Sequence, residues 1–335
     1  MRIAAIIAAV VFQVGILAYM GGEREYVVRT GKIVYLRTAP VDPQDAFRGD
    51  YVRLDYEISD IPPGYMRDGL KIKGQAKHGI CVYAVLDVDE NQVGQLRYVT
   101  DKRPDGELFI RGRLNRGWES ASAPIRYGIE AYFVEQGKGK AIEQLRGQRQ
   151  GIQVPLEMET ALGSNGIAVL KGYRCGKLGI GIEIKTDPND RTRRVYSAKV
   201  KLKNVSDAPL AIIDLPEERS ISLEPDSRWA GSNSLPWRWV NENAPLKTVE
   251  NSDVRVLQAG QEYEFAIDFR NPAWFVKKDN GTPHTISDPN IGWGNNFRLV
   301  YRPPSKEQCK HLDKADMIWH GYLRSSSFNG GGRID

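Results

Sequence analysis

Short runs in which apolar and polar residues alternate recur along the chain and predict a mainly β protein. From Tyr51 to Ile58 every second residue is apolar, starting at Val52, and the residues between are charged apart from Tyr51. Successive side chains of a strand point to opposite faces, so this is the pattern of a half-buried antiparallel strand. Before residue 180, further strands are predicted over 31–36, 81–86, 95–99, 108–114, 125–134, 152–159 and 167–172.

Two connecting segments in this first half have patterns of their own. The polar residues 87–94 predict a hairpin turn between two strands. Residues 140–146 are the best candidate for a helix, because Ile142 and Leu145 are three positions apart. The first half is therefore predicted to be a β-rich α+β domain.

The second half keeps the period of two and has no long helical pattern. Ala198, Val200 and Leu202 alternate with lysines. Further short strands are predicted over 210–215, 263–269, 297–301 and 317–324, with turn residues between them. Many short strands separated by turns favour a β-sandwich. At the level of the fold this half is similar to the immunoglobulin-like accessory domains of bacterial surface proteins.

The longest apolar run lies at the N-terminus, from Ile3 to Met20, interrupted only by Gln13 and Gly15. A helix of about 18 residues rises about 27 Å, close to the hydrocarbon thickness of a bilayer. A cleavable signal peptide needs small residues before its cut, where Met20 fits poorly. We favour an uncleaved signal anchor, with cleavage as the alternative. The short segment before the run and the lack of a second such run lead us to expect the body outside the cytoplasm.

Length and charge set the outline of the molecule. At 335 residues the chain exceeds the size at which one core usually stops growing. We predict a transmembrane signal anchor over 1–22, a β-rich domain over 26–178 and an immunoglobulin-like sandwich over 179–335. The net charge of +5 comes from basic residues interspersed with acidic ones. No basic stripe with aromatic residues is present, so we expect no nucleic-acid partner.

A sequence motif begins two residues before the strand predicted from Tyr51 and continues into it. Gly49, Asp50, Tyr51, Leu54 and Tyr56 spell Gly-Asp-Tyr-x-x-Leu-x-Tyr. Gly tolerates a tight corner and Asp bonds back to nearby amides, so Asp50 is predicted to be a turn residue, with a functional carboxylate as the alternative. This spelling resembles the bacterial GDYxxLxY protein family, which is named for the motif.

A second motif supports the resemblance in the same order along the chain. Members carry an Arg-Tyr-Gly-Ile-Glu-type strand, which stands here as Arg126, Tyr127, Gly128, Ile129 and Glu130. A Gly-Lys-Gly and acidic segment follows in the family, and here it ends at Glu143. The resemblance covers the first domain and implies a membrane-anchored bacterial protein. It implies no reaction and no catalytic residue, because the family has no assigned activity.

Candidate chemistry elsewhere is sparse. His78 with Cys81, and Cys309 with His311, are the only local pairs of metal-binding type, whereas tetrahedral zinc takes four ligands. None of the four histidines lies in a recognised nucleophile motif. We therefore expect no metal, no cofactor and no catalytic site. If an oxidising compartment pairs two of the three cysteines, we expect the pair to be Cys175 and Cys309, which lie in loop-like segments.

Six of the seven tryptophans lie between Trp229 and Trp319. They are predicted to fill the sandwich core and fix its loops, because each buries a large area. The alternative concerns Trp237 and Trp239, which share one side of a strand. An exposed pair there would bind a glycan or a protein partner.

These patterns together predict a non-catalytic protein of the bacterial inner membrane, with its body on the periplasmic or extracellular side. Residues 3–20 would bind the membrane, and the body would bind another membrane or envelope component. The alternative is an envelope hydrolase or glycan-binding protein that uses the carboxylates of Asp50 and Glu130 or exposed tryptophans. Convergence of Asp50 and Glu130 in an open cleft would favour the enzyme.

Overall fold

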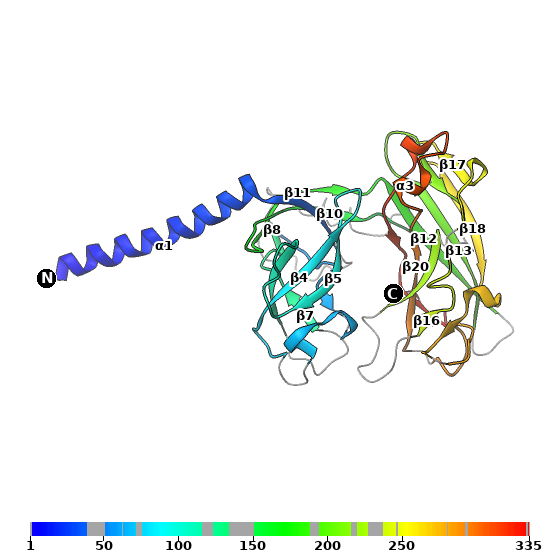
Figure 1. The fold of residues 1–335 in the computed structure, drawn as a ribbon, viewed down its shortest axis with the longest axis horizontal. Coiled ribbons are helices and arrows are strands. Elements are labelled where there is room, and N and C mark those ends of the chain that lie inside the picture. Colours follow the sequence, from blue (N-terminus) through cyan, green and yellow to red (C-terminus); the bar gives the residue numbers. More distant parts are fainter. Residues whose placement is uncertain are drawn as a thin grey trace.

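The computed structural model describes residues 2–38, 51–61, 63–71, 76–115, 123–133, 151–187, 194–215, 220–226, 237–245, 247–279, 281–291, 294–332 and 334. Within these ranges the chain is mostly β, as predicted, and has one long N-terminal helix. Figure 1 shows this helix, α1, projecting from the first of two β lobes that lie side by side. The first lobe contains β1–β8, β10 and β11, and the second contains β9 and β12–β22.

Helix α1 spans Arg2–Thr30 and is long and apolar enough to cross a membrane. Its apolar side chains are exposed; Phe12, for example, is 69% accessible. The last turns pack on the first lobe instead. Val27 is buried there, and Asn165 Nδ2 donates a hydrogen bond of 3.1 Å to Glu23 Oε1.

The first lobe has two sheets and a separate strand pair. The larger sheet has the order β3–β7–β6–β4–β5, the smaller has β1–β10–β11, and β2 pairs with β8. Their bounds are β1 Lys32–Arg37, β2 Tyr51–Arg53, β3 Asp60–Ile61, β4 Cys81–Val88, β5 Gly94–Thr100, β6 Phe109–Leu114, β7 Ala123–Arg126, β8 Ala131–Phe133, β10 Leu156–Leu162 and β11 Ala168–Cys175. Short 3-10 turns cover Pro63–Tyr65 and Asp68–Lys71. Apolar residues of both sheets form one core, which includes Leu36, Val82 and Met158.

The second lobe is a β-sandwich, as predicted. One sheet has the order β18–β13–β12–β9, and the other has β15–β20–β21 with β22 on β20. The bounds are β9 Ile152–Gln153, β12 Leu178–Thr186, β13 Val195–Asn204, β15 Ile221–Pro225, β18 Glu262–Asp268, β20 Asn296–Tyr301, β21 Leu323–Arg324 and β22 Phe328–Asn329. Val200 and Leu299 from the two sheets share one core. The likeness to immunoglobulin domains stays a prediction.

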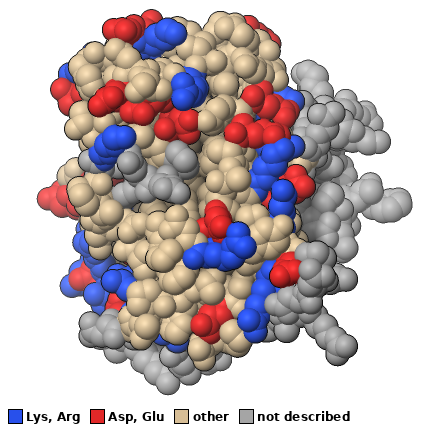
Figure 2. Space-filling view, turned by 90° about the vertical axis from the view of Figure 1, so that its right-hand side faces the viewer, with Lys and Arg blue, Asp and Glu red and all other residues tan. Residues whose placement is uncertain are grey.

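Smaller elements complete the second lobe. Two strand pairs join β14 to β17 and β16 to β19. These elements and the short helical turns are β14 Leu210–Ile213, β16 Arg238–Trp239, β17 Val254–Leu257, β19 Val276–Lys277, η4 Asn251–Asp253, η5 Pro272–Trp274, α3 Lys306–Cys309 and η6 Ala315–Met317. On the face of this lobe seen in Figure 2, basic and acidic side chains are intermixed. In this lobe, lysines of β13 pair with glutamates of β18, as Lys203 does with Glu262 at 2.7 Å.

The chain passes between the lobes more than once. β9 adds to the edge of β12 in the second lobe, and the chain then returns to the first lobe for β10 and β11. The predicted strand 152–159 is therefore two strands. Pro155 lies between them and has no N–H for a ladder hydrogen bond, which accounts for the break. The predicted domain boundary after 178 stays a prediction.

Other predicted strands are also shorter in the structure. β2 ends at Arg53 and the chain turns at Tyr56–Ser59, although Leu54, Tyr56 and Ile58 of the predicted strand are buried as expected. The predicted strand 125–134 divides into β7 and β8 at Gly128, whose φ is +80°. Of the strand predicted over 317–324, only β21 is present. The hairpin between β4 and β5 is confirmed. Helix 140–146, Gly49, Asp50 and Glu143 lie outside the described residues.

The predicted disulfide between Cys175 and Cys309 is not formed. Cys309 is fully buried in α3, and its thiol lies 3.9 Å from the carbonyl of Pro304. Cys175 is exposed at the end of β11 in the first lobe. The prediction was wrong because it relied on the loop-like sequence around the two cysteines, which carries no information about the lobe to which each belongs.

Candidate functional site

The two family motifs interlock in the first lobe. The amide of Leu54 donates to the carbonyl of Glu130 at 2.8 Å, next to the pairing of β2 with β8. The Tyr56 hydroxyl donates to the carbonyl of Ile129 at 2.7 Å. In return, the Tyr127 hydroxyl donates to the carbonyl of Ile58 at 2.5 Å. Each motif thus satisfies buried backbone groups of the other, which accounts for their presence together.

Glu130 closes the turn between β7 and β8. Its Oε1 accepts from the amide of Tyr127 at 2.5 Å, and its Oε2 accepts from the amide of Gly128 at 3.0 Å. Burial raises the pKa of Tyr127 well above its ordinary value, and the nearby Glu130 carboxylate adds to this. The tyrosine hydroxyl therefore remains a donor. The geometry gives the Glu130 carboxylate a structural role as a cap of this turn.

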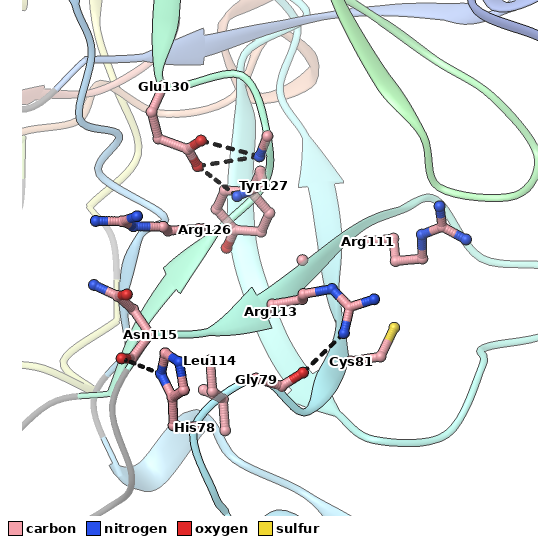
Figure 3. A pocket seen from close by; sticks show the side chains of 12 residues that line it. His78, Gly79, Cys81, Arg111, Arg113, Leu114, Asn115, Arg126, Tyr127 and Glu130 are labelled. Carbon is pink, nitrogen blue, oxygen red and sulfur yellow. Dashed lines mark hydrogen bonds between the residues drawn. The ribbon is translucent and has the colours of Figure 1, made fainter. Parts of the chain in front are cut away.

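A pocket of about 530 Å³ opens beside the turn, and we call it the basic pocket (Figure 3). Three arginines line it: Arg111 and Arg113 from β6, and Arg126 from β7. Arg111 and Arg113 share a strand face because they are two residues apart, and Arg113 lies directly opposite Arg126 in the sheet. Glu130 is the only carboxylate among the described lining residues, and its oxygens accept from backbone amides.

The hydrogen bonds around the basic pocket leave part of this positive charge available. Arg113 Nη1 donates to the carbonyl of Gly79 at 2.9 Å, and His78 Nδ1 lies 2.6 Å from the carbonyl of Asn115. Arg111 and Arg126 are exposed, and neither has a salt bridge to a described residue. Across the described part of the chain, no three side chains of the metal-binding types come together. The arrangement can therefore hold an anion through guanidinium groups.

A smaller hollow of about 190 Å³ connects this region to α1. It shares Arg111, Tyr127 and Gly128 with the basic pocket, and Met20, Glu23 and Arg24 of α1 also line it. Met20 is the last residue of the apolar run. The charged residues that line this hollow therefore lie next to the end of the apolar run of α1.

A second cluster of charged side chains lies between the lobes, and we call it the junction network. Arg37 Nε lies 3.0 Å from Glu157 Oε1, and both side chains are at most 4% exposed. The Arg37 guanidinium stacks 4.0 Å from the ring centre of Tyr322 and donates to its carbonyl. The Tyr322 hydroxyl donates to Glu57 Oε2 at 2.8 Å. These contacts join β1 and β10 of the first lobe to the segment before β21 of the second.

Opposite charges in the junction network keep the Arg37 guanidinium protonated although it is buried. Burial alone lowers the pKa of Arg37, but Tyr322, Glu57 and Glu157 outweigh burial and hold the pKa above its ordinary value. Arg174 supplies a second cation at 2.8 Å from Glu157 Oε2. A buried pair with such partners is costly to break, so this network supports structure.

The suggested binding surface at Trp237 and Trp239 is corrected by the structure. The side chains are only 7% and 3% exposed, because they belong to the second core. Trp239 stacks on Trp274 with ring centres 5.4 Å apart, and its Nε1 donates to the carbonyl of Ala273. The pair points to one side, as expected, but that side faces the interior.

Sequence reasoning singled out Arg126, as part of the second motif, but it did not single out Arg111, Arg113 or the arginines of the junction network. One signal for the pocket was present, since Arg111 and Arg113 are two residues apart in a predicted strand. The position of Arg126 opposite Arg113 depends on the pairing of β6 with β7. Asp50 lies outside the described residues, so its predicted convergence with Glu130 stays a prediction.

Comparison with known proteins yields one match. The family described as GDYXXLXY protein matches residues 13–172. No curated protein and no solved structure is significantly similar to the chain. The matched region holds the second part of α1, both motifs, and every residue lining the basic pocket. Over residues 13–172, this match supports the relationship to the GDYXXLXY protein family that the two motifs indicate.

Proposed function

We propose that the chain is a non-catalytic protein anchored by one helix in the bacterial inner membrane, with its body outside the cytoplasm, where it binds another membrane or envelope component. The observation that carries the anchoring is α1, whose apolar residues stand clear of both lobes (Figure 1). Leu17 and Val11, for example, are 69% and 65% exposed. Such a surface is unfavourable in water and favourable in a bilayer.

A binding role is supported by how the candidate catalytic groups are used. Glu130 caps a turn, and the side chains of His78 and His311 each lie at hydrogen-bond distance from a backbone carbonyl. The burial of Trp237 and Trp239 removes the aromatic pair on which glycan binding would rest. The junction network joins the two β lobes through the contacts of Tyr322 with Arg37 and Glu57, which suits a protein that presents a fixed surface.

Anchoring is tested by extraction of membranes with alkaline carbonate. Wild-type protein should stay in the pellet and be released by detergent. A charge at the centre of the run, in the variant Phe12→Arg, costs about 2.5–3.5 kcal/mol of insertion free energy and should increase the extracted fraction. The matched control Tyr26→Arg places the same charge outside the apolar run and should behave as wild type. Release of the wild type by carbonate would contradict anchoring.

The side of the membrane on which the body lies and the partner that it binds need separate measurements. Protease added to intact spheroplasts should digest the body if it lies outside the cytoplasm, and protection would contradict that orientation. Crosslinking in intact cells, followed by purification in mild detergent, should recover one reproducible membrane or envelope protein. Repeated recovery of the chain alone would contradict the interaction.

A further inference from the structure

We propose that the basic pocket binds the phosphate of an anionic lipid headgroup, and this inference rests on the membrane anchoring proposed above. The ligand class follows from the lining. Guanidinium groups bind phosphate oxygens through charge-assisted and often bidentate hydrogen bonds. Arg111, Arg113 and Arg126 surround a space of about 530 Å³, which is within the usual range for small-ligand sites.

The charge of the pocket lining favours a ligand that carries a negative charge and no positive charge of its own. The lining contains three guanidinium groups and one carboxylate, and the Glu130 oxygens already accept from the amides of Tyr127 and Gly128. An ammonium group in the same space would meet like charges. A headgroup with a phosphodiester and hydroxyl groups therefore fits better than one that also carries choline.

The position of the pocket along the membrane normal favours a lipid as the source of the phosphate. The apolar run ends at Met20, and Glu23 and Arg24 line the hollow that shares Arg111 with the basic pocket. At about 1.5 Å per residue, they lie about 5–6 Å beyond Met20 along the helix. The headgroup layer on each side of a bilayer is about 5–7 Å thick. The hollow thus lies at the depth of lipid phosphates.

Contacts between helix and lobe fix this depth. Asn165 bonds to Glu23 at 3.1 Å, and Val27 is buried against the first lobe one turn later. Gly163 lies where an added Cβ would come within 2.9 Å of Val27, which shows how closely the two elements approach. The lobe therefore cannot move away from the membrane surface unless these contacts break.

The test uses the full chain in micelles of an uncharged detergent. Short-chain phosphatidylglycerol is titrated by calorimetry, with short-chain phosphatidylcholine, glycerol phosphate and inorganic phosphate as separate arms. Phosphatidylglycerol should bind most tightly, and its affinity should fall as salt is added. The variant Arg111→Gln/Arg126→Gln should lose about tenfold or more in affinity, since each arginine supplies charge-assisted bonds.

The matched control is Lys277→Gln/Lys314→Gln, which removes the same two charges from exposed positions of the second lobe and should bind as wild type. Arg111→Lys/Arg126→Lys keeps the charge and should bind with intermediate affinity. Both pocket arginines are exposed, so an unchanged circular dichroism spectrum is expected for each variant.

Equal binding of phosphatidylglycerol by wild type and the glutamine variant would overturn the proposal. So would binding of inorganic phosphate as tight as that of the lipid. Failure of anchoring would appear separately, as solubility of the chain without detergent.

Discussion

Replacing Arg37 by Met tests whether the junction network holds the lobes together. The substitution removes the cation 3.0 Å from Glu157, inside a site where both side chains are at most 4% exposed. It also removes the donor to the carbonyl of Tyr322 in the second lobe. Breaking a buried ion pair by deleting one partner costs about 3–5 kcal/mol of unfolding free energy. Arg174 still contacts Glu157, so we expect a loss near the lower end of that range.

The assay is urea unfolding of the detergent-solubilised chain, followed by tryptophan fluorescence and by far-ultraviolet circular dichroism. All variants are made in a Trp118→Phe background, in which the remaining tryptophans all lie after residue 228. The described ones lie in the second lobe, whereas Arg37 lies in the first. A network that couples the lobes must therefore lower the midpoint of the tryptophan transition. The matched control Arg270→Met breaks an exposed pair with Asp268 and should leave the unfolding midpoint close to that of the unmutated chain.

A double-mutant cycle isolates the pair itself. Arg37→Met/Glu157→Met removes both charges, so it leaves no uncompensated carboxylate and should cost clearly less than the sum of the two single variants. Additive losses would refute the reasoning for the pair. A loss no greater than that of Arg270→Met, or an unchanged tryptophan transition, would refute coupling between the lobes.

Three further changes test local features. Tyr127→Phe deletes a buried hydroxyl bond between the motifs and should cost about 1–3 kcal/mol by urea unfolding; an unchanged midpoint would contradict the interlock. Gly112→Ala places a Cβ within 2.4 Å of a neighbouring side chain and should cost about 1–3 kcal/mol, whereas Gly64→Ala, with nothing within 4 Å, should be near neutral. A maleimide should label exposed Cys175 in native protein and reach Cys309 only after unfolding, because burial hides that thiol and raises its pKa; equal labelling rates would contradict its burial.

The period of two in the sequence predicted which residues of most strands face a core, because that property is local. It did not predict where strands end. Leu54 and Tyr56 are buried as the alternation requires, although β2 has already ended at Arg53. The break at Gly128 depends on a positive φ that the surrounding turn imposes. Pro155 was a visible signal for a break, but not for a change of lobe.

The junction network was beyond prediction for a different reason. Glu157 occupies a polar position in a predicted strand, and alternation would place such a residue in solvent. In the structure β10 is covered on this face too, so Glu157 is only 3% exposed. Val300 of β20 is likewise fully buried at the contact with Tyr322 and Val93. A pattern within one strand shows one buried face, but it carries no information about what packs on the other.

The same long-range contacts connect α1 to the second lobe by a short path. α1 ends at Thr30 and β1 begins at Lys32, so the helix continues almost directly into the strand that carries Arg37. Six strand residues span about 20 Å, and at their end Arg37 contacts Tyr322. The β1–β10 ladder fixes Arg37 in the first lobe, and the contacts of Tyr322 with Arg37 and Glu57 join it to the second, so we expect a change in the tilt of α1 to move both lobes together. If α1 is inserted in a membrane as proposed, a force applied to α1 and a ligand bound to the second lobe would therefore act on the same body.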